Sequence, residues 1–284
     1  MMIDTHCHLQ FKGFDDSRDE VIKHCQERQV ILNIVGTQKD TSRAAVELAE
    51  KNDNMYASIG FHPIHLFPTH IDEEESSFMS REEGFDEEYY AQLAKSEKVI
   101  GIGETGLDFF HMPKDKSKQE VFEKQKEVFL AQANFAHKHD LPLVIHSRDT
   151  HTEMIQALQS LNRKINGTMH CFAGNWEQAQ KYLDFGLYLG FTGVVTFPAK
   201  KTNPQAQIDL LEVVKKMPLD RILVETDAPY MAPQAYRGEQ AEPWMVEEVI
   251  KKIAEIRQEN VEKIAKAVLQ NAFNLFTRIN SKIS

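Results

Sequence analysis

Short apolar runs alternate with longer amphipathic stretches along nearly the whole chain. Eight runs of strand length begin near residues 2, 30, 55, 99, 141, 167, 187 and 221: MMID, VILNIVG, MYASIG, VIGIGE, LPLVIH, GTMHCF, LYLGFTG and RILVET. Runs of this length and composition predict strands buried on both faces. The stretches between them have helical spacing of apolar residues. This alternation favours a single α/β domain, a (β/α)8 barrel of the TIM type, regular or distorted. A doubly wound open sheet is the alternative.

Helix-start and helix-stop residues support this reading. The signals are Ser17 with Glu20, Ser117 with Glu120, Asn175 before WEQAQKYLDF, and Gly186 after it. The first two pairs have capping-box spacing, and glycine commonly ends helices. Two further periodic patterns, over 243–257 and 261–277, predict the last helices outside the barrel.

The bulk composition fits one barrel domain over residues 1–284. Hydrophobic residues make up 42% of the 284 positions, enough for a packed core. No apolar run reaches the ~18 residues of a membrane span, and no secretory signal opens the chain. The three cysteines form no CxxC pair, which fits reduced thiols. We therefore expect a cytoplasmic location and no membrane contact.

The net charge of −10 is concentrated in one segment. Residues 70–88, HIDEEESSFMSREEGFDEE, hold nine acids and one arginine, a net of −8, so the remainder carries −10 + 8 = −2. We expect an acidic surface insertion here; a regulatory or partner-binding role is the alternative. The total charge does not exclude a phosphate-bearing substrate, because bound metal ions would be the largest local charges in a site.

Side chains that bind metals recur at the carboxyl ends of the predicted strands. They are His6, His8, His62, Glu104, His146, His170 and Asp227. In a parallel barrel these ends form one rim, where active sites lie. His6 and His8 share one face of their strand, whereas Cys7 between them points away and is expected to be buried filler. Five of the twelve histidines stand at strand ends, so the joint pattern predicts a metal site.

Four histidines and two carboxylates are too many for one tetrahedral ion. They suit two ions roughly 3.5–4 Å apart and bridged by a carboxylate. Glu104 is the natural bridge, with His6, His8 and Asp227 on one ion and His146 and His170 on the other. A donor set rich in imidazole predicts bound Zn, Mn, Co or Ni, with Mg able to support turnover.

The motifs IDTHCHL, GFHP, GIGETGLDFF, IHSRD, MHCFAG and VETDAPY together resemble the TatD-type metal-dependent hydrolases of the amidohydrolase superfamily. The resemblance extends in order from residue 3 to about 275. It implies a metal-dependent deoxyribonuclease or related phosphodiesterase on a (β/α) barrel. It also implies two ligand sets that share Glu104: one adds His6, His8 and Asp227, and the other adds His146 and His170.

Three features depart from the family pattern. Residues 70–88 are longer and more acidic than the family implies. His111 and Met112 stand where the family often has a basic residue. Near the end, RGEQAEP keeps Arg237, Glu242 and Pro243 but has Ala241 in place of an asparagine. The ligands are untouched, so these differences bear on which substrate the rim accepts.

Several residues are assigned provisional roles in phosphodiester hydrolysis by a metal-activated water. Asp227 is expected to bind metal and accept the water proton, and Glu104 to share general-base work. His62, spare in the ligand count, is a candidate imidazolium for a phosphate oxygen or the leaving group. Arg148 and Arg237 are candidate phosphate clamps, with surface ion pairs as the alternative.

Two further sets are weighed against structural alternatives. Asp108 and Glu225 are candidate acceptors for ligand histidine N–H groups, or else a turn cap and a strand-end salt bridge. Rim aromatics could stack on a base, or serve the core: Phe61, Phe109, Phe110 and Phe172. The expected partner is DNA or another phosphodiester, single-stranded or frayed and entering by an end. No stable protein partner is predicted.

Two other functions stay open. The same dinuclear site could hydrolyse an acyl ester or amide, for example by removing an aminoacyl group from a nucleic acid. A binding or scaffolding protein with a vestigial site is the other alternative, but such a site should have lost a ligand, and none is missing here.

Overall fold

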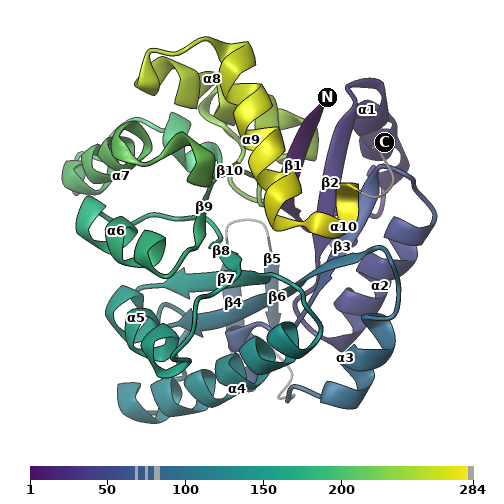
Figure 1. The fold of residues 1–284 in the computed structure, drawn as a ribbon, viewed down its shortest axis with the longest axis vertical. Coiled ribbons are helices and arrows are strands. Elements are labelled where there is room, and N and C mark those ends of the chain that lie inside the picture. The colour runs from purple at the N-terminus through teal and green to yellow at the C-terminus, as the bar shows by residue number, and fades with distance from the viewer. Residues whose placement is uncertain (68–69, 74–75, 80–83, 281–284) are drawn as a thin grey trace.

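The protein is a parallel β-barrel surrounded by helices (Figure 1). The computed structural model describes residues 1–67, 70–73, 76–79 and 84–280. Eight strands pair in parallel in the order β1 (Met2–Cys7), β2 (Val30–Val35), β3 (Met55–Ile59), β6 (Val99–Asp108), β7 (Leu143–Arg148), β8 (Gly167–Met169), β9 (Tyr188–Phe191) and β10 (Ile222–Val224). All eight predicted strands are confirmed.

The barrel closes between β10 and β1, but not by a regular ladder of the described residues. Cys7 forms an isolated parallel bridge with Ala228, and the Thr5 hydroxyl donates to the Val224 carbonyl at 3.0 Å. These contacts join the two ends of the strand order, so the open-sheet alternative is wrong and the barrel is nearly closed and distorted.

Helices that lie between the strands, or after the last of them, cover the outside of the barrel (Figure 1). They are α1 (Arg18–Glu27), α2 (Lys39–Glu50), α3 (Glu87–Leu93), α4 (Lys118–Lys138), α5 (His151–Ser160), α6 (Trp176–Asp184), α7 (Pro204–Lys216) and α8 (Val246–Arg257). Within the described residues, none of the helices is long and apolar enough to cross a membrane.

Most of the predicted helix signals are found. Ser117 accepts from the Glu120 N–H at 3.2 Å and Glu120 accepts from the Ser117 N–H at 2.9 Å, a capping box. Asn175 accepts from the N–H of the residue three further on, and Gly186 follows α6 with a φ of +93°. The capping box at Ser17 is wrong: the φ of −120° and ψ of −5° lie outside the extended region that a capping side chain needs, and no side-chain cap forms.

The last helices close the amino-terminal end of the barrel. The pattern predicted over 243–257 forms a 3-10 turn (Pro243–Met245) followed by α8. The pattern predicted over 261–277 forms α9 (Val261–Leu275), and α10 (Thr277–Asn280) follows it. Four side chains of α9, α10 and the residue between them pack on the first residues of the strands: Ala272, Leu275, Phe276 and Ile279. We call the opposite end, where the carboxyl ends of the strands lie, the open end of the barrel.

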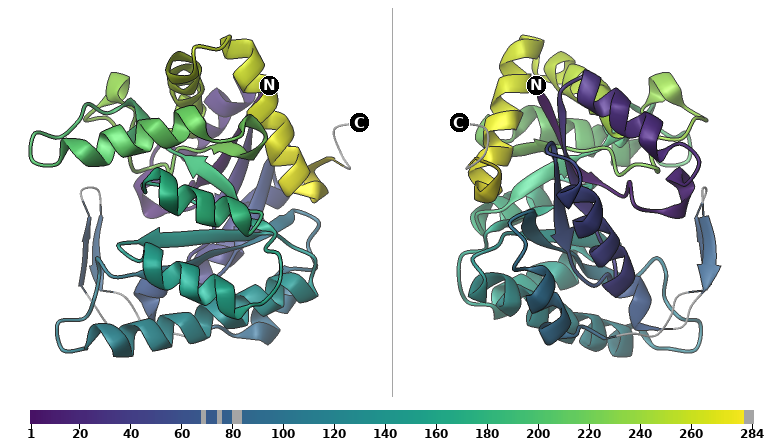
Figure 2. Two further views of the ribbon diagram at one scale, coloured as in Figure 1. Left: turned by 60° about the vertical axis from the view of Figure 1, so that its left-hand side comes forward. Right: turned by 90° about the vertical axis from the view of Figure 1, so that its right-hand side faces the viewer.

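The acidic segment 70–88 contains a β-hairpin. Strands β4 (His70–Glu73) and β5 (Ser76–Met79) pair antiparallel, and the segment runs into α3, where Asp86 caps the helix. The hairpin stands on the opposite side of the barrel from α9 and α10, which is the carboxyl-end side (Figure 2). Glu87 and Glu88 are exposed; the side chains from 68 to 83 lie outside the described residues, so the surface placement of those acids stays a prediction.

Candidate metal centre

Seven candidate side chains meet at the open end of the barrel. His6 and the adjoining His8 come from β1, His62 follows β3, Glu104 lies on β6, His146 on β7, and His170 and Asp227 follow β8 and β10. All but His146, which is half-buried, are buried. Two positions differ from expectation: β6 continues to Asp108 and β7 to Arg148, so Glu104 and His146 lie within their strands rather than at the ends.

One group consists of His6, His8 and Asp227. The two Nε2 atoms of the histidines are 3.2 Å apart, and Asp227 Oδ1 lies 3.3 Å from His8 Nε2 and 3.7 Å from His6 Nε2. Four donors at 2.0–2.1 Å around a tetrahedral ion are about 3.3 Å from one another. The spacing therefore fits three ligands that share one divalent ion.

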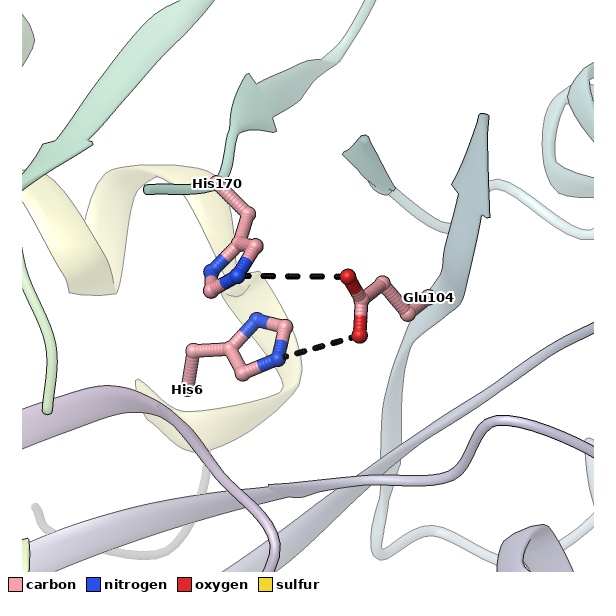
Figure 3. Close-up of side chains that lie close together, drawn as sticks. All are labelled: His6, Glu104 and His170. Atoms are coloured by element: carbon pink, nitrogen blue, oxygen red, sulfur yellow. Dashed lines mark ion pairs between the residues drawn. The ribbon is translucent and has the colours of Figure 1, made fainter. Parts of the chain in front are cut away.

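Glu104 lies at the centre of the cluster, with its two oxygens facing different partners. Oε2 is 3.5 Å from His6 Nε2 and 3.8 Å from His8 Nε2. Oε1 is 2.8 Å from His146 Nδ1 and 3.9 Å from His170 Nε2. Figure 3 shows this carboxylate beside the stacked rings of His6 and His170, with one oxygen facing each ring. A carboxylate placed in this way can bridge two ions, as the sequence predicts.

The second ligand group differs from the expected one. Donor atoms of His146 cluster with Glu104 and His62, whereas those of His170 cluster with Glu104 and His6. The rings of His146 and His170 are 6.5 Å apart, while His170 stacks on His6 at 3.6 Å. The reason is that His170 Nδ1 lies 2.9 Å from Glu225 Oε1, which holds the ring on the β1 side.

Three histidines have a partner on the outer ring nitrogen, so their other ring nitrogen points inward. His8 Nδ1 donates to the Val35 carbonyl at 2.7 Å, His146 Nε2 contacts Asp108 Oδ2 at 3.1 Å, and His170 Nδ1 faces Glu225. Acceptors of this kind fix the tautomer in which the other nitrogen binds metal. Asp108 and Glu225 thus lie where the sequence places them, and Asp108 also accepts from the backbone N–H of His111 at 2.8 Å.

His62 has the opposite tautomer. Its Nδ1 accepts from the Ile64 N–H at 3.2 Å, so the neutral ring carries its proton on Nε2, which lies 3.3 Å from Glu104 Oε1. A protonated nitrogen is not a ligand, so we place His62 outside the ligand set. Burial lowers the pKa of His62 to about 4 although Glu104 opposes this. Burial thus opposes a His62 imidazolium at neutral pH, and the role of His62 toward a phosphate or leaving group stays a prediction.

The two buried carboxylates remain ionised. Burial alone would raise the pKa of Glu104, but His62, His146 and His6 hold it well below its usual range. Burial acts in the same direction on Asp227, whose pKa is nevertheless lowered by His170 and His8. Buried charges need compensation, and a cluster of anionic oxygens and imidazole nitrogens fits divalent cations.

Sequence reasoning did not find two residues that shape the site. Asp4 lies on the same face of β1 as His6, and its carboxylate accepts from the N–H groups of His6 and Thr226 at 3.1 and 3.0 Å. It thereby ties β1 to the loop that carries Asp227. The sequence feature that could have identified Asp4 is an acidic residue inside an otherwise apolar predicted strand. Phe11 stacks on His8 with ring centroids 4.5 Å apart, and no sequence pattern marked it.

Other residues named from the sequence lie around this cluster. Cys7 is buried, with its sulfur 3.6 Å from the Asn33 carbonyl. The guanidinium of Arg148 lies 3.8 Å from the ring centroid of Phe110, and that of Arg237 lies 4.7 Å from the ring centroid of Phe197. The role of both arginines in phosphate binding stays a prediction.

The metal-free protein should lose stability as the pH rises from about 7 to 10. Burial opposes the charged form of both His146 and His170, but Asp108 and Glu104 raise the pKa of His146 to about 9, and Glu225 and Asp227 raise that of His170 to about 10. The unfolded pKa is about 6.5. The folded state thus binds more protons above pH 6.5, and its free energy of unfolding falls as the pH rises through 9 to 10.

Urea unfolding of the chelator-treated protein across this pH range measures the effect. The variant with both His146→Asn and His170→Asn is the control and should show a smaller decline. A free energy of unfolding that stays constant or rises up to pH 10 would contradict the assigned contacts.

Comparisons with known proteins agree with this geometry. A family model described as "TatD related DNase" matches residues 3–277. The chain is 37% identical to an uncharacterized metal-dependent hydrolase, YabD, of Bacillus subtilis (strain 168), covering 99% of this chain and 100% of the relative. The crystal structure of YjjV, a TatD homologue from Escherichia coli K12, superposes with a TM-score of 0.78 at 30% identity, covering 97% of this chain and 98% of that one. A TatD-family hydrolase from Entamoeba histolytica shares the fold, with a TM-score of 0.78, 21% identity and 98% of each chain covered.

Proposed function

The chain belongs to the TatD-related DNase family and is a metal-dependent hydrolase; from this premise we propose that it is a deoxyribonuclease that hydrolyses phosphodiester bonds from an end of single-stranded or frayed DNA. The observation that carries the proposal is the buried cluster at the open end of the barrel, in which Glu104 faces histidines on both of its oxygens. A phosphodiester is a stable anion, and a site of this kind is suited to neutralising it.

We propose two divalent ions as cofactors. His6, His8 and Asp227 would hold one, and His146 the other, with Glu104 between them and His170 beside it. Imidazole donors favour Zn, Mn, Co or Ni, and Mg could support turnover at a weaker position. When bound, such ions neutralise charge on the phosphate and lower the pKa of water.

The protein's own groups handle the proton and the substrate. Asp227 is ionised at neutral pH, so it can accept the proton that the attacking water loses as its oxygen bonds to phosphorus. The P–O bond to the departing nucleotide then breaks. His62, with its proton on Nε2, can donate a hydrogen bond to a phosphate oxygen or to the leaving oxygen. Arg148 and Arg237 would bind the flanking phosphates.

Cleavage of end-labelled single-stranded DNA by the metal-loaded protein tests this proposal. We expect progressive shortening from one end and little cleavage of the same sequence as a circle, because a circle has no end. A matched oligonucleotide with a 3′-aminoacyl ester tests the acyl alternative in the same reaction. Duplexes with blunt and with frayed ends test the strand preference.

The products separate the possible functions. Loss of the aminoacyl group with an intact phosphodiester backbone would favour an acyl hydrolase and contradict the nuclease. Equal cleavage of circle and linear strand would contradict attack from an end. Intact DNA after incubation with protein whose metal content is verified would contradict the proposal as a whole.

A further inference from the structure

Phe110 is the one exposed ring among the four rim phenylalanines named from the sequence. Phe61 is 1% and Phe172 4% exposed, and Phe109 is half-buried against the core, whereas Phe110 is 57% exposed. Three of the four therefore contribute to packing. A single exposed phenylalanine is common on protein surfaces, so only its surroundings can give it a meaning.

The surroundings of Phe110 are polar, planar and next to the metal centre. Its ring is covered on one side by the guanidinium of Arg148 at 3.8 Å, and the ring of His111 meets it edge-on with centroids 4.9 Å apart. Arg148 is the last residue of β7 and lies in register with Asp108 on β6. Asp108 in turn contacts the ring of His146 at 3.1 Å. The Asp108 carboxylate also lies 3.0 Å from His111 Nδ1, so the side chains of His111 and Asp108 connect Phe110 to a candidate metal ligand.

An aromatic ring paired with a guanidinium is the surface that unpaired bases bind. Every base has a π face, so stacking on phenylalanine tolerates any sequence, and arginine adds a flat cation that stacks on bases and binds phosphate. Bases within a duplex are already stacked on one another. A platform of this kind beside a hydrolytic centre selects bases that are free to leave the stack.

We propose that Phe110 and Arg148 form a stacking platform for the nucleobase next to the phosphate being cleaved. The proposal rests on the proposed deoxyribonuclease function and adds the way in which the substrate is held. It makes the base itself, and not only the phosphate backbone, part of what the enzyme recognises. It also gives a physical reason for a preference for single-stranded or frayed ends.

The test compares DNA that carries a base at the stacking position with DNA that lacks it. Single-stranded oligonucleotides receive one abasic site at each of the three terminal nucleotides in turn, and kcat/KM is measured for each. At one position we expect the wild-type protein to prefer the intact strand by about tenfold, within the range for loss of one base–aromatic stack. Phe110→Leu, which keeps an apolar side chain without a ring, should bring that ratio close to one.

Two variants serve as controls. Phe110→Tyr keeps the ring and should retain the wild-type ratio. Ile208→Ala removes another exposed apolar side chain, 53% exposed on α7, and should also retain it. A fluorescent 2-aminopurine at the same position gives a readout independent of catalysis: it should be quenched on binding to the wild-type protein but not to Phe110→Leu.

The outcomes separate this inference from the proposed function. One contrary result is wild-type protein that cleaves DNA with equal kcat/KM for abasic and intact strands at all three positions. Another is wild-type protein that cleaves DNA but quenches 2-aminopurine at none of them. Either result would contradict the stacking platform and leave the proposed nuclease function intact. The same holds if Phe110→Leu retains the wild-type ratio. If the metal-loaded protein neither binds nor cleaves the oligonucleotide, both proposals fail together.

Discussion

Replacement of Asp227 by asparagine is expected to lower the rate of hydrolysis by about 10²- to 10⁴-fold, the usual contribution of a general base. Most of the bound metal should remain, because an asparagine oxygen can still occupy the position of Oδ1 between His6 and His8. What the variant loses is the negative charge that accepts the water proton.

The backbone at this position makes asparagine a clean substitution. Asp227 has a φ of +62°, in the left-handed region that asparagine adopts more readily than most residues. Its backbone N–H donates to the His6 carbonyl at 2.9 Å, and asparagine keeps that bond. A loss of activity therefore reports on the carboxylate and not on a rearranged loop.

Metal content and turnover are measured together on purified wild-type and Asp227→Asn protein. Asp184→Asn, at the exposed end of α6, is the matched control and should behave as wild type. Near wild-type turnover by Asp227→Asn would remove the role of this residue as base. Complete loss of metal from the variant would instead make it chiefly a ligand.

The architecture of the barrel could be predicted from the sequence because the burial of each strand requires apolar residues that are consecutive in the chain. Strands covered on both faces appear as apolar runs, and each of the eight runs became a strand. The parallel order then required all strand ends to meet, which brought His6 and Asp227 together across 221 positions of sequence. The hairpin of β4 and β5 was not predicted, because its residues are too polar to stand out as strands.

The composition of the cluster could also be predicted, but the grouping of its members could not. Strand position identifies which side chains reach the rim. The tautomer of each ring depends on its outer partner, and two of these partners come from other strands: Val35 on β2 for His8, and Asp108 on β6 for His146. The separation of His146 from His170 likewise follows from Glu225, whose contact is visible only once β8 and β10 are placed.

Removal of metal is the second change for which a large effect is expected. Chelator-treated protein should hydrolyse DNA about 10³-fold more slowly or worse, because several kcal/mol of charge stabilisation on the phosphate is lost. His146→Ala should reproduce part of this loss with the chelator absent, since it deletes the side chain closest to Glu104 Oε1, at 2.8 Å. Metal content and turnover should fall together in that variant.

His137→Ala provides the matched control for the loss of a histidine. His137 lies exposed on α4, away from the strand ends. This variant should keep the wild-type metal content and rate. A His146→Ala protein with full metal and full rate would show that the assignment of this ligand is wrong.

The most direct test of the metal centre is a titration of chelator-treated protein with Mn²⁺ or Zn²⁺, followed by the rate of cleavage of a single-stranded oligonucleotide. The account predicts no cleavage before metal is added, and a rate that rises to a plateau at two equivalents of metal per chain. Cleavage at the full rate in excess chelator, or protein that takes up no metal at any concentration, would contradict it.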